Sequence, residues 1–315
     1  MSFKKDLPLT SSHWGTYRAK VKDGKVKELI GWENDKDPSP IGQGIVDVHN
    51  HQTRIDSPMI RKSWMDKGPG SNNSLRGTDP FISISWDEAE KIVSNELNRV
   101  KNDFGNASIF GGSYGWASAG RFHHAQSQLH RFLNCIGGYT RSKFTYSFAA
   151  AEAMVPHILG SYRAYLDTCT SWESIEENTE LFICFGGVPL KNGQIAQGGT
   201  GSHKQKEKLI RSANAGIKFV NFSPLKSDLL DEVNGEWLAL RPNTDVAIML
   251  GLAHTLYKEK LYDDKFIEKY TEGFDTFLPY LQGDIDGIVK DANWASSISE
   301  IPSEKIISLA KEMSS

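Results

Sequence analysis

Three polar stretches follow predicted strands and carry side chains suited to bind a phosphorylated ligand. They are Gly186-Gly187-Val-Pro-Leu-Lys191-Asn192-Gly-Gln194, Ser223-Pro224 and Arg241-Pro-Asn243-Thr-Asp245. In an open parallel sheet, ligands bind beyond the carboxyl ends of the strands. Glycines let backbone N–H groups approach a diphosphate, a lysine neutralises it, and a helix N-terminus adds partial positive charge. The pattern predicts a site for a nucleotide or dinucleotide, and three ordinary loops are the alternative.

The acidic residue of the third stretch supports the same prediction. The carboxylate of Asp245 can accept two donors from a purine edge such as guanine, or the hydroxyls of a ribose. Alternatively, Asp245 is simply favoured in the first turn of its helix. The sequence has neither Gly-x-Gly-x-x-Gly nor a Gly-Lys-Ser motif, so NAD and ATP lack their usual fingerprints.

A second group of residues suits the binding of an oxygen atom or a metal. Tyr114 and Trp116 follow a predicted strand on a glycine-rich stretch, where a phenol O–H and an indole N–H can donate to an oxygen. Packing is the alternative for these two rings. Ser147 precedes an alanine-rich helix, where its hydroxyl either caps the helix or, as an alkoxide, ligates a metal. No Gly-x-Ser-x-Gly elbow surrounds Ser147, which argues against a hydrolase nucleophile.

The periodicity of the chain predicts the elements that position these residues. Ser85 and Glu88 form a capping box that begins a helix ending at Gly105, and a short strand, Ser108–Phe110, follows. Other predicted strands are Tyr17–Val21, Lys25–Ile30, Leu181–Phe185, Ile217–Phe222 and Trp237–Leu240, and later helices are Lys204–Ala213, Val246–Tyr257 (capped by Asn243 or Thr244) and Pro302–Met313. This order predicts an α/β fold: a small β-rich N-terminal segment, then Rossmann-like domains with largely parallel sheets and covering helices.

Composition argues against several classes of partner and cofactor. The 315 residues carry a net charge of only −3 without a basic cluster, so no nucleic-acid partner is expected. No apolar run approaches the roughly 20 residues that cross a bilayer, so no membrane insertion is expected. The three cysteines, Cys135, Cys169 and Cys184, form no Cys-x-x-Cys motif, which argues against an iron–sulfur cluster. The N-terminal residues lack a secretory or twin-arginine signal, which predicts a cytoplasmic protein, or a periplasmic one if an upstream signal has been lost.

A series of motifs runs along nearly the whole chain. It comprises Ser12-His-Trp-Gly15, Ser57-Pro-Met-Ile-Arg-Lys62, Ile84-Ser-Trp-Asp-Glu-Ala89, Gly111-Gly-Ser-Tyr-Gly-Trp116, Thr145-Tyr-Ser-Phe-Ala-Ala-Ala151, Val155-Pro-His-Ile-Leu-Gly160, Thr244-Asp-Val-Ala-Ile-Met-Leu-Gly-Leu-Ala-His-Thr255 and Gly273-Phe-Asp-Thr-Phe-Leu-Pro-Tyr-Leu281. In this order the motifs resemble the dimethyl sulfoxide reductase family of molybdopterin enzymes, which includes trimethylamine N-oxide and biotin sulfoxide reductases. Many separated matches in order are more specific than any one motif.

The resemblance implies an enzyme that removes an oxygen atom from small S-oxides or N-oxides, with electrons from an unknown donor. The implied cofactor is molybdenum with bis(molybdopterin guanine dinucleotide), without an iron–sulfur cluster. Ser147 matches the serine whose alkoxide ligates the molybdenum, and Tyr114 and Trp116 match residues whose O–H and N–H point at the metal. The residues that match the cofactor-holding positions are Trp116, Gly187, Lys191, Asn192, Gln194, Ser223, Pro224, Asn243 and Asp245.

The resemblance also implies a division into domains. Residues 1–60 begin a β-rich first domain, 61–159 form an α/β domain with the metal-ligand region, and 160–315 form most of a nucleotide-binding α/β domain. Family members are far longer, so the chain is expected to be the N-terminal part of a longer protein. Around Ser147 the sequence has Thr145 and Glu152 where the family usually has Asp and Gln. Two alternatives stay open: a molybdopterin enzyme that transfers a hydroxyl group without net redox change, and an inactive truncated nucleotide-binding fragment.

Overall fold

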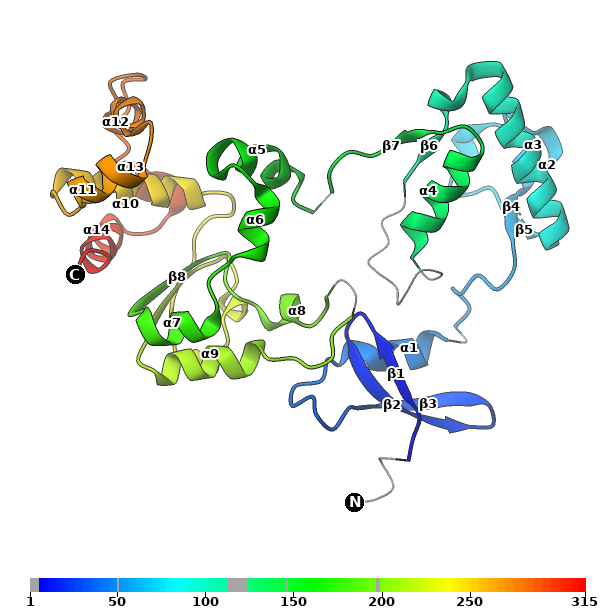
Figure 1. The fold of residues 1–315 in the computed structure, drawn as a ribbon, viewed down its shortest axis with the longest axis horizontal. Coiled ribbons are helices and arrows are strands. Elements are labelled where there is room, and N and C mark those ends of the chain that lie inside the picture. Colours follow the sequence, from blue (N-terminus) through cyan, green and yellow to red (C-terminus); the bar gives the residue numbers. More distant parts are fainter. Residues whose placement is uncertain (1–5, 50, 113–123, 146, 197–198) are drawn as a thin grey trace. The chain divides into compact units, whose positions relative to one another are not determined.

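The computed structural model describes residues 6–49, 51–112, 124–145, 147–196 and 199–315 (Figure 1). Its internal contacts divide the chain into two compact units. The N-terminal unit consists of Met1–Cys169 and Gln194–His203, and the C-terminal unit consists of Thr170–Gly193 and Lys204–Ser315. The stretch Gln194–His203 therefore packs with the N-terminal unit although both of its neighbours in the sequence belong to the C-terminal unit.

An antiparallel three-stranded sheet opens the N-terminal unit. Its strands are β1 (Leu9–Ser12), β2 (Gly15–Lys22) and β3 (Lys25–Gly31), and the helix α1 (Ile41–Val48) follows them. Tyr17 and Ala19, on one face of β2, pack with Leu29 of β3 into a small core. Asp23 and Gly24 both have positive φ, which closes a two-residue hairpin between β2 and β3. The two strands predicted near the N-terminus are confirmed.

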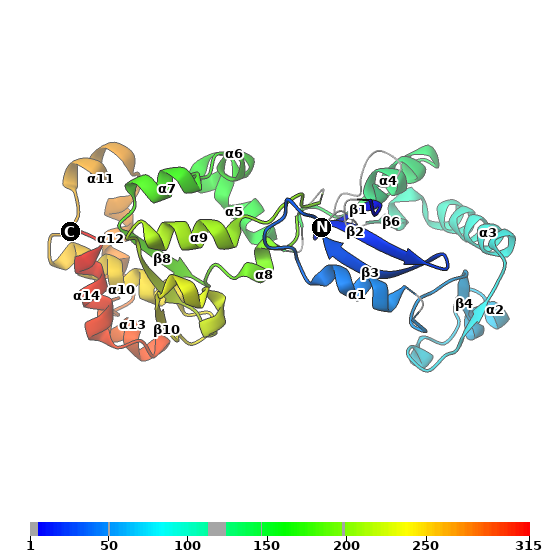
Figure 2. The same cartoon turned by 90° about the horizontal axis from the view of Figure 1, so that it is seen from below.

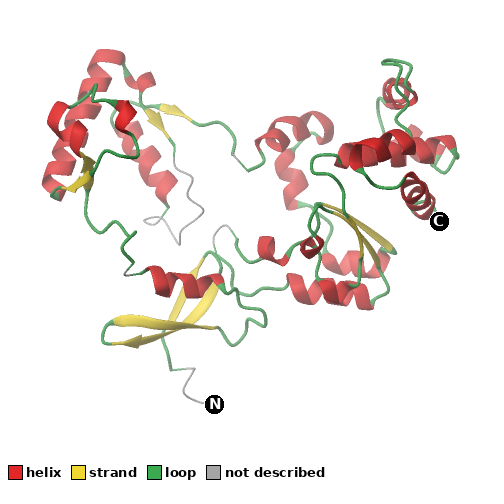
Figure 3. Cartoon of the chain, turned by 180° about the vertical axis from the view of Figure 1, so that it is seen from behind, coloured by secondary structure: helices red, strands yellow, loops and turns green. Residues whose placement is uncertain are grey.

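The rest of the N-terminal unit is mainly helical, with two short strand pairs (Figure 3). In chain order its elements are β4 (Met59–Arg61), α2 (Lys62–Lys67), β5 (Phe81–Ser83), α3 (Trp86–Phe104), β6 (Phe110–Gly111), α4 (Ala125–Cys135), β7 (Thr140–Arg141), α5 (Ala149–Leu159) and α6 (Tyr162–Asp167). The strands β4 and β5 are antiparallel, whereas β6 and β7 are parallel. The predicted capping box is confirmed, because Ser85 and Glu88 each accept the backbone N–H of the other at the start of α3.

The predicted strand Ser108–Phe110 is wrong in its bounds. Asn106–Ser108 form a 3-10 turn, and pairing with β7 involves only Phe110 and Gly111. The hydroxyl of Ser108 donates to the carbonyl of Phe104 at 3.0 Å. This side-chain bond to the end of α3 favours a turn there, so the strand begins two residues later than predicted.

The C-terminal unit is a three-layer α/β/α arrangement (Figure 2). Its elements are α7 (Trp172–Asn178), β8 (Leu181–Phe185), α8 (Leu190–Gly193), α9 (Gln205–Asn214), β9 (Lys218–Phe222), β10 (Glu236–Leu238), α10 (Asp245–Lys258), α11 (Asp264–Tyr270), α12 (Phe274–Gln282), α13 (Ala292–Ser299) and α14 (Ser303–Glu312). The sheet is parallel, in the order β10-β9-β8. The helices α7 and α9 cover one face of it, where Phe219 packs against Leu209. The helices α10, α13 and α14 cover the other, where Val220 packs with Ile248 and Leu309.

The sequence prediction of an α/β fold is confirmed by this architecture. The parallel sheet and its covering helices occur where the apolar runs and helical stripes placed them, with small differences at the ends of the elements. Among the described residues, no helix is both long enough and apolar enough to span a lipid bilayer.

Candidate functional site

Asp228, in the loop after β9, joins the two loops that follow β8 and β9. Its carboxylate accepts the hydroxyl of Ser223 at 2.6 Å and the ammonium of Lys191 at 3.2 Å. Its backbone carbonyl accepts the N–H of Val188 at 2.7 Å. The hydrogen bond from Ser223 and the charge of Lys191 hold the pKa of the Asp228 carboxyl below its ordinary value of 3.8. Asp228 was not predicted from the sequence. It brings together two residues that were, Ser223 and Lys191.

Gly187 lies where these two loops approach each other closely. Its φ is +77°, and a Cβ there would stand 2.3 Å from the carbonyl oxygen of Asp228. The neighbouring Gly186 has a similar φ of +85°, but its Cβ would meet no heavy atom within 4 Å. Glycine at position 187 is therefore required by the contact between the loops as well as by the backbone conformation. The sequence suggested only the approach of a ligand at this position.

Ser223 is fully buried, and its polar groups bond within the protein. Its N–H donates to the carbonyl of Leu238 at 3.2 Å, and its carbonyl accepts the indole N–H of Trp237 at 2.8 Å. Its hydroxyl accepts the N–H of Leu225 at 3.2 Å in addition to its bond to Asp228. Ser223 consequently orders the loop, whereas the next residue, Pro224, is exposed at the surface of the loop.

Asn243 and Asp245 come from the connection between β10 and α10. Because β10 pairs with β9 in parallel, this connection leaves the same edge of the sheet as the loops after β8 and β9. Thr244 occupies the N-cap position of α10, as predicted, but its hydroxyl donates to the carbonyl of Arg241 at 2.6 Å and accepts no helix N–H. Among the described residues, no hydrogen bond joins Asn243 or Asp245 to Asp228.

A hollow of about 450 Å³ lies beside the Gly187 loop. It is lined by Trp172, Gly187, Val188, Pro189, Asn192, Lys204, Gln205 and Lys208. The amide of Gln205, the first residue of α9, donates to the carbonyls of Val188 and Pro189, each at 3.2 Å. The side chain of Lys208 pairs with Glu173 and is only 19% exposed, whereas Lys204 is exposed and offers its positive charge to a ligand in this hollow. The wall of the hollow suits an anionic group.

Ser147 is exposed in the turn that leads into α5. The N-cap position of α5 is occupied by Phe148, so Ser147 lies one residue before the position that the capping alternative gave it. The carboxylate of Glu152 accepts the N–H of Thr145 at 2.6 Å, and this bond closes the turn around Ser147. Glu152 stands in the first turn of α5, where a negative charge is favourable. The Thr145 hydroxyl is buried, with no hydrogen-bond partner within the described part of the chain.

Three predicted site residues remain: Gln194, Tyr114 and Trp116. Gln194 belongs to the N-terminal unit, where its side-chain oxygen accepts the hydroxyl of Ser39 at 3.3 Å. Tyr114 and Trp116 fall outside the described residues. Within the described ranges, no group of three or more His, Cys, Asp or Glu side chains is arranged to hold a metal ion.

Replacement of Asp228 by asparagine is expected to loosen the two loops. A hydrogen bond to a charged group contributes about 1.5–3 kcal/mol, so local opening should become roughly tenfold more frequent. Because the pKa of Asp228 is lowered in the folded protein, its stabilisation is present above 3.8 and is lost as the pH falls through the lowered value. Protection of the Val188 amide against hydrogen exchange should therefore fall about tenfold in D228N at pH 7, and the difference in protection between wild type and D228N should shrink once the pH falls below 3.8.

Asp231, an exposed carboxylate three residues further along, provides the matched control. The substitution Asp231→Asn should leave the protection of Val188 unchanged at both pH values. If the difference in Val188 protection between wild type and D228N were the same at neutral and acidic pH, the role of the charged carboxylate would be contradicted.

Two family models match the chain. The model described as molybdopterin oxidoreductase matches residues 54–313. The model described as molybdopterin oxidoreductase N-terminal domain matches residues 10–48. The first match includes the Ser147 turn and all three loops at the carboxyl edge of the sheet.

Curated relatives match nearly the whole chain. The dimethyl sulfoxide/trimethylamine N-oxide reductase of Rhodobacter capsulatus is 39% identical over 303 residues, which are 96% of this chain and 37% of the relative. The biotin sulfoxide reductase of Cereibacter sphaeroides is 40% identical over 280 residues, 89% of this chain and 38% of the relative. The trimethylamine-N-oxide reductase of Haemophilus influenzae is 36% identical over 307 residues, 98% of this chain and 37% of the relative. The chain thus spans well under half the length of these relatives.

A solved structure shares the fold. Acetylene hydratase from Pelobacter acetylenicus superimposes with a TM-score of 0.57 and 20% sequence identity. The match covers 96% of this chain and 38% of that chain. At this level of identity the likeness supports the fold alone.

Proposed function

Because this chain belongs to the molybdopterin oxidoreductase family, we propose that the protein reduces S-oxides or N-oxides by two-electron oxygen-atom transfer at a molybdenum cofactor. One observation carries this proposal. Relatives named as reductases of dimethyl sulfoxide, trimethylamine N-oxide and biotin sulfoxide are 36% to 40% identical to the chain over 89% to 98% of its length. The substrate is then a small oxide, and an electron donor of unknown identity completes the reaction.

The proposed cofactor is bis(molybdopterin guanine dinucleotide), and the carboxyl edge of the β8–β9–β10 sheet has the donor set to hold a guanine dinucleotide. The side chain of Lys191 is 64% exposed, so its ammonium can neutralise a diphosphate. Asp245 offers carboxylate oxygens to the N–H edge of guanine at the start of α10. The residues proposed to hold the cofactor are Trp116, Gly187, Lys191, Asn192, Gln194, Ser223, Pro224, Asn243 and Asp245.

Ser147 is the proposed protein ligand of the molybdenum. It stands exposed directly before α5, and the partial positive charge of the helix N-terminus favours its alkoxide form. The buried Thr145 hydroxyl, without a partner among the described residues, adds a polar group two residues away that suits a polar ligand. Tyr114 and Trp116, which lie outside the described residues, are proposed to donate their O–H and N–H to the oxygen atom of the substrate.

The bound molybdenum cofactor supplies the redox chemistry, and no iron–sulfur cluster is proposed. The residues of the chain hold the guanine dinucleotide at the sheet edge, ligate the metal through Ser147 and donate hydrogen bonds to the substrate oxygen through Tyr114 and Trp116. The division into domains at 1–60, 61–159 and 160–315 remains a proposal. So does the compartment: cytoplasmic, unless a twin-arginine signal precedes this sequence.

The proposed function is tested on the full-length protein from a host that makes the molybdenum cofactor. We expect stoichiometric molybdenum, guanine nucleotide released on denaturation, and oxidation of dithionite-reduced viologen that depends on dimethyl sulfoxide, methionine sulfoxide or trimethylamine N-oxide. Molybdenum without any oxide-dependent oxidation would contradict oxygen-atom transfer and favour a hydroxyl-transferring enzyme. A protein without molybdenum would contradict the proposal altogether.

A further inference from the structure

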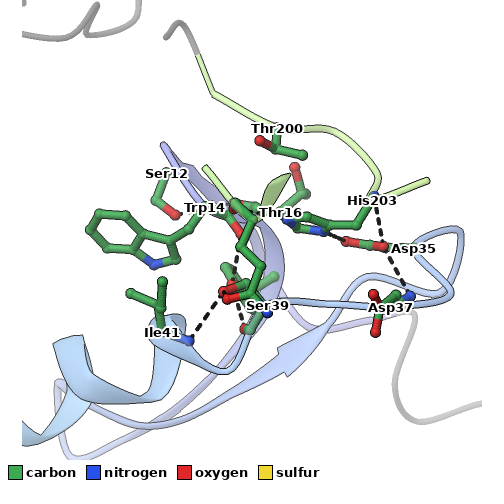
Figure 4. A network of polar contacts seen from close by, with 12 residues as sticks. Ser12, Trp14, Thr16, Asp35, Asp37, Ser39, Ile41, Thr200 and His203 are labelled. Carbon is green, nitrogen blue, oxygen red and sulfur yellow. Dashed lines mark hydrogen bonds and ion pairs between the residues drawn. The ribbon is translucent and has the colours of Figure 1, made fainter. Parts of the chain in front are cut away.

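Asp35 and His203 form a buried pair in the N-terminal unit, 168 residues apart in the sequence (Figure 4). The Nδ1 of His203 lies 2.7 Å from Oδ2 of Asp35, and the two side chains are 3% and 0% exposed. The other carboxylate oxygen, Oδ1, accepts the backbone N–H of His203 at 3.0 Å and that of Asp37 at 3.2 Å. Three nitrogen atoms thus contact the two oxygens of this buried carboxylate, and both oxygens have a hydrogen-bond partner.

The imidazole of His203 faces an acceptor on each side. Its Nε2 lies 2.9 Å from the backbone carbonyl of Gln194, and its Nδ1 faces the Asp35 carboxylate. A carbonyl oxygen can only accept, so Nε2 carries a proton and donates to the carbonyl of Gln194. The ring is therefore held between the Asp35 carboxylate and the backbone of Gln194.

Through this ring, Asp35 determines the position of Gln194. Gln194 and His203 are the two ends of the stretch that packs with the N-terminal unit, and the ring joins them across nine residues of chain. Ala196 and Thr200 add bonds to the carbonyl of His13, at 3.0 Å and 3.2 Å. The backbone at Gln194 is therefore held from both sides.

The side chain of Gln194 is oriented by a second contact. Its Oε1 accepts the hydroxyl of Ser39 at 3.3 Å, and the carbonyl of Ser39 is in turn held by the Tyr17 hydroxyl at 2.8 Å. Within the described part of the chain, the hydrogen bonds of this amide use its oxygen alone. The amide nitrogen carries two N–H donors, and these are left for a ligand.

We propose that Asp35 and His203 are positioning residues that hold Gln194 so that its side-chain amide donates to the guanine dinucleotide cofactor. This inference rests on the proposed function, because it takes the cofactor as the acceptor. Neither residue carries a local sequence signal for this role: Asp35 lies in a turn after β3, and His203 precedes α9. The positioning role of Asp35 and His203 is inferred from their contacts in the folded protein.

The test compares four variants of the full-length protein isolated with its cofactor. His203→Phe keeps a ring of similar size but removes both ring nitrogens, so hydrogen exchange at 194–196 and 199–203 should accelerate at least about tenfold, and molybdenum and guanine nucleotide should be lost at least about tenfold faster on dialysis. Gln194→Ala removes the amide but not the pair. It should lose the cofactor at a similarly raised rate, while exchange at 199–203 stays at the wild-type rate.

Two further variants separate positioning from general stability. In Asp35→Asn the amide can donate to Nδ1 of a neutral ring that still donates from Nε2 to Gln194, so exchange and cofactor retention should stay near wild type. Glu33→Gln breaks the ion pair with Arg18, at 2.7 Å in the same unit, and should change neither readout at Gln194. If Glu33→Gln and His203→Phe weakened cofactor retention equally, a merely structural role would explain both and the inference would be overturned.

The failure of this inference is distinguishable from the failure of the proposed function. Normal cofactor content in wild type, together with unchanged exchange and retention in His203→Phe, would overturn the positioning role alone. A wild-type protein without molybdenum or guanine nucleotide would overturn the proposed function, and with it the role of the Gln194 amide.

Discussion

Replacement of Ser147 by alanine is expected to lower the rate of oxide reduction at least about a hundredfold, because losing even the outer partners of a metal ligand costs about 10–100-fold. Phe148, and not Ser147, occupies the N-cap position of α5. A loss of kcat at an unchanged thermal midpoint of unfolding would report on the metal and not on the fold. The measurements are kcat with reduced viologen, molybdenum content and the thermal midpoint of unfolding.

Two controls sharpen this expectation. Ser147→Cys offers a thiolate in place of the alkoxide, so it should retain molybdenum while changing the absorption spectrum of the metal. Ser161→Ala removes a hydroxyl that does cap a helix, since it accepts the N–H of Ala164 at 3.1 Å at the start of α6. It should lower the thermal midpoint without a comparable loss of kcat. Full activity and normal molybdenum content in Ser147→Ala would rule out Ser147 as the ligand.

Replacement of Gly187 by alanine is the second substitution with a large expected effect. The new Cβ would stand 2.3 Å from the carbonyl oxygen of Asp228, and this backbone atom cannot turn aside as a flexible side chain would. Relieving the overlap costs about 1–3 kcal/mol, and the left-handed conformation adds about 1–2 kcal/mol. The two loops would have to separate, which breaks the 2.7 Å bond from Val188 to Asp228. We expect molybdenum and guanine nucleotide content to fall at least about tenfold.

Gly186→Ala is the matched control, because Gly186 has a similar positive φ but its Cβ would meet no heavy atom within 4 Å. This variant carries the conformational cost without the overlap, so it should lose far less cofactor. The difference in cofactor content between Gly187→Ala and Gly186→Ala measures how much the contact between the two loops contributes to cofactor binding. Equal cofactor content in both variants would show that the approach of Gly187 to Asp228 does not matter for binding.

Much of the C-terminal unit follows from local sequence. The strand β8 occurs at the predicted residues, because a short apolar run that ends at two glycines can be buried on both faces of a parallel sheet. The capping box of α3 was equally predictable, since both of its partners lie within one turn of helix. The same reasoning failed at Ser108, where a side-chain bond to the end of α3 replaced strand pairing by a turn.

The loops of the candidate site were predictable as loops, but not in their internal contacts. Polar residues after three strands indicate one edge of a parallel sheet, so Lys191, Ser223 and Asp245 were named from the sequence. Asp228 was missed because nothing in its neighbourhood distinguishes it from any other aspartate in a loop. Asp228 matters because the fold places the loop after β8, with Gly187 and Lys191, in contact with it.

The sequence by itself determined the α/β class, the parallel sheet and the family resemblance, because these depend on hydrophobic periodicity and ordered motifs along the chain. Only the tertiary structure decided that Asp228 joins two loops, that Phe148 and not Ser147 occupies the N-cap position of α5, and that Asp35 is paired with His203 across 168 residues. The physical reason is that hydrogen bonds and close packing act over a few ångströms of space. Residues far apart in the chain become partners only after the fold has brought them within that reach.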